Sequence, residues 1–121
     1  MAYKLFFRKF RDLYSSEQPI VFNSQGCWLT GMIHHSSANN QSIHKGVIIV
    51  VGGPQTRVGS HRQFVLLARY LACNGINVMR FDYAGIGDSE GEYSNFLTAH
   101  QDIDAAINQF QLSCPQLESI N

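Results

Sequence analysis

The alternation of hydrophobic and polar positions first predicts a β-hairpin near the start of the chain. Residues 20–22 are β-branched and aromatic, and residues 27–34 alternate well enough to form the returning strand. Between them lies the turn-forming sequence NSQG, at positions 23–26. The following polar stretch, residues 36–45, is typical of a loop.

The next two apolar runs predict a β-α-β unit. Residues 47–51 are continuously apolar, which is typical of a strand buried on both faces of a parallel sheet. A helix is predicted to follow, capped by Ser60 and ended by the Asn-Gly pair at 74–75. Residues 76–81 form the predicted second strand, reached by a right-handed crossover. The apolar face predicted for the helix consists of Phe64, Leu67, Ala68 and Leu71.

A second helix and the beginning of another strand complete the pattern. Residues 82–94 form a glycine-rich loop, and residues 96–110 carry apolar side chains at helical spacing. Pro115 stops this helix, and residues 117–121 resemble the approach to a strand. The sequence therefore predicts an α/β protein: an antiparallel hairpin, then β-α-β-α, then the start of a further strand.

Residues 1–17 form a basic amphipathic leader that precedes a single domain at 18–121. Aromatic and leucine side chains recur in it at helical spacing, with basic side chains between them. Such a leader fits either an extra helix packed on the domain or a helix lying on a membrane surface. The positions at helical spacing are Tyr3, Phe6, Phe7, Phe10, Leu13 and Tyr14.

Composition narrows the classes of partner. Nine basic and nine acidic residues give a formal net charge of zero, whereas a nucleic-acid-binding protein needs a basic excess. Cys27, Cys73 and Cys114 form no CxxC pair and no metal-ligand cluster, so we predict neither metal nor cofactor. Three is an odd number and no secretory signal is recognised before them, so we predict reduced thiols and a cytoplasmic location. No apolar run approaches the roughly 20 residues that cross a bilayer.

GDSEG, residues 87–91, matches the Gly-x-Ser-x-Gly pattern of the serine hydrolase nucleophile elbow. An elbow serine directly follows a strand and directly precedes a helix. Ser89 instead lies eight residues after the predicted strand end and well before the next helix. None of the five histidines has a sequence context that marks it as the partner of Ser89. We therefore predict a loop residue, with Ser89 as nucleophile the less favoured interpretation.

The wider string RFDYAGIGDSEGE resembles the segment after the fourth strand of α/β-hydrolases, commonly Asp-x-Arg-Gly-x-Gly-x-Ser. Asp82, Gly85, Gly87 and Ser89 occupy its positions, and Ala84 stands in place of the arginine. The resemblance implies a structural loop in which the glycines permit unusual backbone angles and the polar side chains bind loop amides.

VVGGPQTRVGSHRQF resembles the oxyanion-hole loop after the third strand of the same superfamily. The resemblance implies that a backbone N–H of this loop stabilises the substrate oxyanion. Pro54 has no N–H, so Gly53 is the first candidate donor and Gln55 the second, with Gly52 and Pro54 shaping the turn. A tight turn without a catalytic role is the alternative.

Three basic side chains follow this loop: Arg57, His61 and Arg62. They fit an anion or carboxylate contact at the rim of a substrate site. They also fit the solvated start of a helix.

Both motifs together resemble the hydrolase 1 family associated with the bacterial exosortase A system, over roughly residues 18–121. The resemblance implies a serine hydrolase acting on an ester or acyl substrate and linked to exopolysaccharide loci. In that family the nucleophile elbow follows the fifth strand, so the whole triad is expected beyond Asn121. No catalytic residue is then assigned here, and the chain is predicted to be an inactive N-terminal portion. The alternative is a small non-catalytic binding module that uses the loop at 52–62.

The α/β-hydrolase resemblance also implies a strand order that begins 1-2-4-3-5. The third strand would then lack most of one neighbour, because the fifth has barely begun at Asn121. An apolar, unpaired strand edge invites association. We expect the isolated chain to be marginally stable or to self-associate, with peripheral contact to the inner membrane through the leader as a further expectation.

Overall fold

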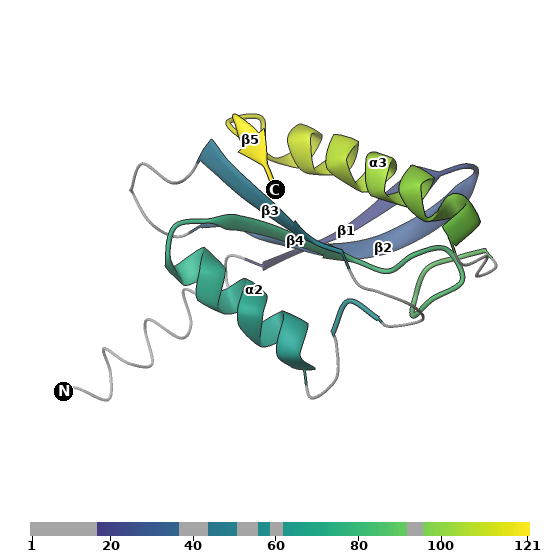
Figure 1. Ribbon diagram of the computed structural model, residues 1–121, viewed down its shortest axis with the longest axis horizontal. Helices are drawn as coiled ribbons and strands as arrows, with labels where there is room; N and C mark the ends of the chain where they lie inside the picture. The colour runs from purple at the N-terminus through teal and green to yellow at the C-terminus, as the bar shows by residue number, and fades with distance from the viewer. Residues whose placement is uncertain (1–16, 37–43, 51–55, 59–61, 92–95) are drawn as a thin grey trace.

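The computed structural model describes residues 17–36, 44–50, 56–58, 62–91 and 96–121. In these residues five strands form one mixed sheet in the order β1-β2-β4-β3-β5, with helix α3 above it and α2 below it (Figure 1). This confirms the predicted fold class, including the order of the strands. The elements are β1 (Glu17–Ser24), β2 (Cys27–His34), β3 (Lys45–Ile49), α2 (Gln63–Cys73), β4 (Asn77–Phe81), α3 (Phe96–Ser113) and β5 (Ser119–Ile120).

The predicted hairpin is present, and its turn is tight. β1 and β2 pair antiparallel out to the Ser24–Cys27 pair. Gln25 and Gly26 connect them with positive φ angles of 53° and 83°, as a two-residue hairpin turn requires. β2 then pairs antiparallel with β4, which joins the hairpin to the parallel part of the sheet.

β3 and β4 run parallel, with Gly46 opposite Asn77 and Ile49 opposite Arg80. Every residue of β4 is buried, because the strand lies in the middle of the sheet between the two helices. β3 begins earlier than predicted and ends at Ile49, and Val50 beyond it is half exposed. β5 pairs parallel with β3 over two residues only.

The apolar face predicted for helix α2 is correct in part, because Ala68 is buried and Phe64 packs against the core. Val65, Ala68 and Ala72 are buried against β4 and β2, whereas Leu67 is exposed. The cap also differs, since Arg62 precedes the first helical residue and the predicted cap, Ser60, lies outside the described residues.

Helix α3 packs against β1 and extends three residues beyond its predicted end. Ala106 and Phe110, both on its predicted apolar face, are fully buried. Pro115 follows shortly after the helix, as predicted. Neither described helix is both long and apolar enough to span a membrane. The buried core comprises Ile20, Phe22, Leu29, Ile33, Ile48, Met79, Phe81, Tyr83, Ile86, Ala106, Phe110 and Cys114.

Candidate functional site

The candidate site lies at the edge of the sheet where the parallel strands end. β3 ends at Ile49 and β4 ends at Phe81, and Ile49 lies opposite Arg80. The two strands therefore end side by side at one edge of the sheet (Figure 1). In open α/β sheets this is the edge at which ligands bind.

Asp82, the first residue after β4, is fully buried at this edge. One carboxylate oxygen accepts the Arg57 backbone N–H at 2.6 Å, and the other accepts the Arg57 guanidinium. The Thr30 hydroxyl and the Asp88 backbone N–H also donate to the carboxylate, each at 3.4 Å. Asp82 therefore joins β2, the segment at 56–58 and the loop at 82–91.

Arg57 is held from several directions. Its guanidinium also donates to Asp88 at 3.2 Å, and its backbone carbonyl accepts a hydrogen bond from Arg80 at 3.0 Å. The side chain is mostly buried. The sequence motif places an arginine at position 84, where this chain has alanine, and Arg57 supplies the ion pair on Asp82 from a different loop.

Arg80 and His34 extend this network beneath the sheet edge. Both side chains are buried, and Arg80 Nε donates to His34 Nε2 at 2.9 Å. Burial and, second, the Arg80 charge lower the pKa of His34 to about 4, against an opposing effect of Glu17. Burial likewise lowers the pKa of Arg80 to about 10. At neutral pH the His34 ring is neutral, and because Nε2 accepts, its proton lies on Nδ1, 3.6 Å from Glu17.

Ser89 lies within the loop after β4 rather than at a strand–helix turn. Its hydroxyl donates to the Asp82 carbonyl at 2.7 Å and accepts the Thr30 N–H at 2.9 Å. In the described part of the chain, none of its hydrogen-bond partners is a histidine. Six residues separate Ser89 from the start of α3 at Phe96. Among the described residues, the hydroxyl therefore has neither the strand–helix position nor the general base of an activated nucleophile.

Two glycines of the loop adopt backbone conformations that side chains disfavour. Gly85 and Gly87 have φ angles of 77° and 57°. A Cβ on Gly87 would clash with an Asp82 carboxylate oxygen. Position 87 therefore needs glycine both for its backbone angle and for its closeness to the buried carboxylate.

The remaining predicted residues fall into two groups. Arg62 is exposed in a left-handed conformation before α2, where its side chain makes no capping hydrogen bond. It is not brought to the Asp82 network by any observed contact. The oxyanion-loop residues Gly52, Gly53, Pro54 and Gln55, together with His61, lie outside the described residues.

Sequence reasoning missed Asp102, a buried acid on α3 that supports the same loop. Its carboxylate accepts hydrogen bonds from the Ser24 hydroxyl at 2.7 Å and the Ala84 N–H at 3.0 Å. Its position was readable in the sequence, because residue 102 falls on the face of α3 that carries Ala99 and Ala106. In the described ranges no cluster of three or more His, Cys, Asp or Glu side chains forms a metal site.

Comparisons with known proteins place this arrangement in a known fold. An esterase from Pyrococcus furiosus superposes with a TM-score of 0.74 and 21% identity, over 91% of this chain and 42% of that one. A serine hydrolase homologue from Coxiella burnetii gives 0.66 and 22% over 85% of this chain and 49% of that one. The fold is that of the N-terminal part of an α/β-hydrolase.

The sequence comparisons cover less of the chain than the structural comparisons do. No protein-family model matches the chain. The lysophosphatidylserine lipase ABHD12 of Danio rerio is 44% identical over 54 residues, which are 45% of this chain and 14% of that protein. The α/β-hydrolase-like chain thus spans less than half the length of these solved relatives and a small part of the lipase.

Replacing Gly87 by alanine tests the packing around Asp82. We expect Gly87→Ala to destabilise the fold by about 2–4 kcal/mol, because it adds a clash with a buried carboxylate to the cost of a left-handed alanine. Gly26→Ala is the matched control, since Gly26 also has positive φ but has open space around its Cβ position. Protease cleavage rates at low protein concentration report the difference. An equal increase of the cleavage rate in both variants would contradict the predicted clash at Gly87.

The lowered pKa of His34 predicts a loss of stability in mild acid. As pH falls from 6.5 towards 4, the unfolded chain binds a proton on His34 before the folded one does. The resulting loss is about 3 kcal/mol, complete near pH 4 and absent above about pH 7. His34→Gln is expected to remove this part of the pH dependence of folding stability. Substitution at an exposed histidine, His100→Gln, is expected to retain it. Unfolding monitored by circular dichroism at each pH measures both. An unchanged pH profile in His34→Gln would refute this assignment.

Proposed function

We propose that this chain is the N-terminal portion of an α/β-hydrolase enzyme that hydrolyses an ester or acyl bond. The observation that carries the proposal is the β1-β2-β4-β3-β5 sheet, with an Asp82-centred loop at the edge where α/β enzymes bind their ligands. The length of the solved relatives supports it, because this chain spans only 42% of the Pyrococcus furiosus esterase. The nucleophile, acid and histidine would then lie in sequence that follows residue 121.

The role proposed for this portion is to supply the oxyanion hole. The backbone N–H of Gly53 would stabilise the developing oxyanion, with Gln55 as the second candidate donor. Arg57, two residues after Gln55, is fixed at its N–H by Asp82 and at its carbonyl by Arg80. These bonds anchor one end of the loop, and a fixed anchor favours a preorganised donor.

The substrate class is a narrower part of the proposal. Similarity to a lysophosphatidylserine lipase favours a lipid ester as the first class to test. The motif resemblance to the exosortase-associated hydrolases instead links the protein to exopolysaccharide loci. The three free thiols at positions 27, 73 and 114 favour a reducing compartment such as the cytoplasm.

Labelling with a fluorophosphonate probe tests where the nucleophile lies. We expect residues 1–121 and their Ser89→Ala variant to remain unlabelled, whereas a form extended by the downstream coding sequence labels. Loss of the nucleophile lowers serine hydrolase turnover by roughly a million-fold, so the contrast is large. Labelling of the 121-residue chain that Ser89→Ala abolishes would overturn the proposal. Absence of label in every form would favour the binding module.

We also propose that the isolated chain self-associates through the β3 edge. Backbone pairing to β5 and Asn121 runs along β3 as far as Ile48, whose N–H donates to the Asn121 carbonyl at 2.8 Å, and the edge at Ile49 and Val50 lies beyond it. Val50, 50% exposed, lies just beyond this pairing. An apolar strand edge of this kind promotes intermolecular pairing.

A single charge at the β3 edge tests this association. We expect Val50→Lys to shift the sedimentation profile towards monomer, because a lysine at an unpaired edge opposes strand addition. Val21→Lys on β1 is the control, since Val21 is 59% exposed but distant from β3 in the sheet order. A monodisperse wild-type chain with a cooperative thermal transition would refute the proposal.

A further inference from the structure

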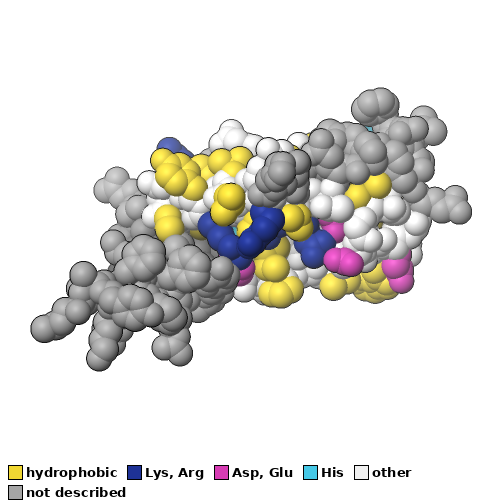
Figure 2. Space-filling model, turned by 90° about the horizontal axis from the view of Figure 1, so that it is seen from below, with side chains coloured by type: hydrophobic (Ala, Val, Ile, Leu, Met, Phe, Trp, Pro, Cys, Tyr) yellow, Lys and Arg dark blue, Asp and Glu magenta, His cyan; other side chains and the backbone are white. Residues whose placement is uncertain are grey.

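Helix α2 presents an apolar stripe to the outside, on the side away from the sheet. Leu66, Leu67 and Tyr70 are 58%, 45% and 67% exposed, and their spacing places them on one face of the helix. We call these three residues the outer stripe. Figure 2, which views the molecule from the α2 side, shows hydrophobic side chains on this face next to a basic cluster. Exposed large apolar side chains that gather in this way mark an interaction surface.

The chain enters the domain beside the outer stripe. Glu17, the first residue of β1, accepts hydrogen bonds from Arg69 Nε at 2.6 Å and from Arg69 Nη2 at 3.4 Å. Arg69 lies three positions after Leu66 and one before Tyr70, so it borders the stripe. This ion pair fixes the point from which residues 1–16 start, within reach of the outer stripe.

The sequence of residues 1–16 complements the outer stripe. Six of its seven aromatic and leucine side chains share one side of a helical projection, and Leu5 with the basic side chains lies outside that side. As a helix, 16 residues extend about 24 Å, which exceeds the roughly 17 Å of α2. We propose that residues 1–16 form an amphipathic helix that packs its apolar side on the outer stripe of α2. This inference is independent of the proposed hydrolase function.

Photo-cross-linking from the outer stripe tests this packing in the full chain. With p-benzoylphenylalanine at Leu67, we expect a cross-link within one chain, at monomer mass, to a peptide from residues 1–14. Leu112 on α3 is the control site, because it is 75% exposed on the opposite face of the sheet. The same probe at Leu112 is expected to give at least roughly tenfold less of this product.

Two leader variants separate apolar packing from charge. Phe6→Ser combined with Phe10→Ser is expected to lower the cross-link yield roughly tenfold or more, because each removed aromatic ring takes apolar contact area with it. Lys4→Ser combined with Arg8→Ser, on the basic side, is expected to leave the yield unchanged.

Three outcomes would overturn the inference. Cross-links found only at twice the monomer mass would assign the outer stripe to a second copy of the chain. Equal yields at Leu67 and Leu112 would show that the leader has no preferred site. Absence of the cross-link from the free chain, together with binding to phosphatidylcholine–phosphatidylserine vesicles that Lys4→Ser with Arg8→Ser abolishes, would assign the leader to the membrane surface.

Discussion

The buried carboxylate of Asp82 is the constraint on which the loop edge of this protein depends. An ionised carboxylate without solvent is costly unless charged and polar groups surround it. Here Arg57 supplies both a backbone N–H and its guanidinium, and Thr30 and Asp88 supply weaker donors. A buried pair of this kind adds little net stability over apolar packing, but losing one partner leaves a costly buried charge. The main effect of the Arg57–Asp82 ion pair is therefore to determine which segments pack together.

Several local features follow from that requirement. Gly87 has to lack a side chain because the carboxylate occupies the adjacent space. Ser89 uses its hydroxyl to close the loop onto β2 and the end of β4, which leaves that hydroxyl committed to structure rather than catalysis. The Arg80 guanidinium donates both to the Arg57 carbonyl and to Nε2 of His34, which can accept because the ring is neutral. On the other side, Asp102 fixes Ala84 to the hairpin strand β1 through Ser24.

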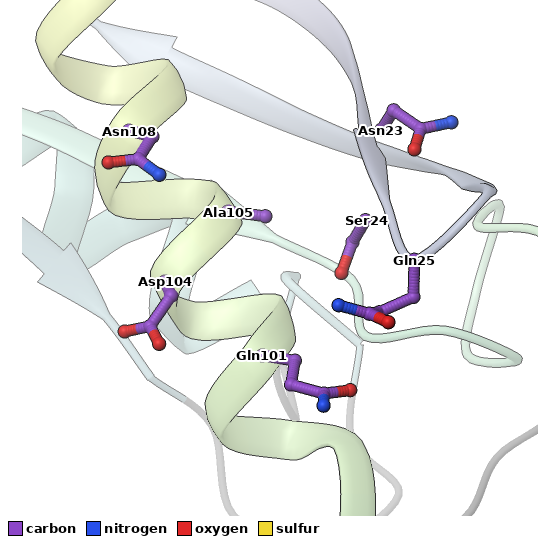
Figure 3. Close-up of a pocket in the computed structure, with 7 residues that line it drawn as sticks. All are labelled: Asn23, Ser24, Gln25, Gln101, Asp104, Ala105 and Asn108. Carbon is purple, nitrogen blue, oxygen red and sulfur yellow. The ribbon is translucent and has the colours of Figure 1, made fainter.

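A polar groove lies away from this edge, between the hairpin turn and α3. It has a volume of about 260 Å³ and is lined mainly by amide side chains, among them Asn23, Gln25 and Gln101 (Figure 3). The side chains surround an open surface depression rather than converging on one point. The Asn23 amide oxygen already accepts the Gly26 N–H of the turn. The groove therefore adds nothing to the chemistry of the loop edge.

Local signals in the sequence were enough to predict the elements and much of the loop after β4. Continuous apolar residues identified β3, the turn-forming NSQG sequence identified the hairpin, and Pro115 bounded α3. The motif placed Asp82 and Ser89 together because their spacing is local. Contacts that join distant segments were not readable: Arg57 meets Asp82 across 25 positions, and Arg80 meets His34 across 46. The buried face of α2 was predicted only in part: Ala68 lies on the inner side as predicted, whereas Leu67 is exposed. Both faces of the helix carry large apolar residues, so only packing on the sheet selects Val65 and Ala72 as inner residues.

A double-mutant cycle on Arg57 and Asp82 tests the central claim most directly. Protease cleavage rates of Arg57→Gln, Asp82→Asn and the double variant give the free energy by which the two residues are coupled. If the ion pair organises the loop edge, the double variant is destabilised by at least about 1 kcal/mol less than the sum of the single variants. Effects that add to within about 0.5 kcal/mol would show that the two side chains act independently, and the account of this edge would then be wrong.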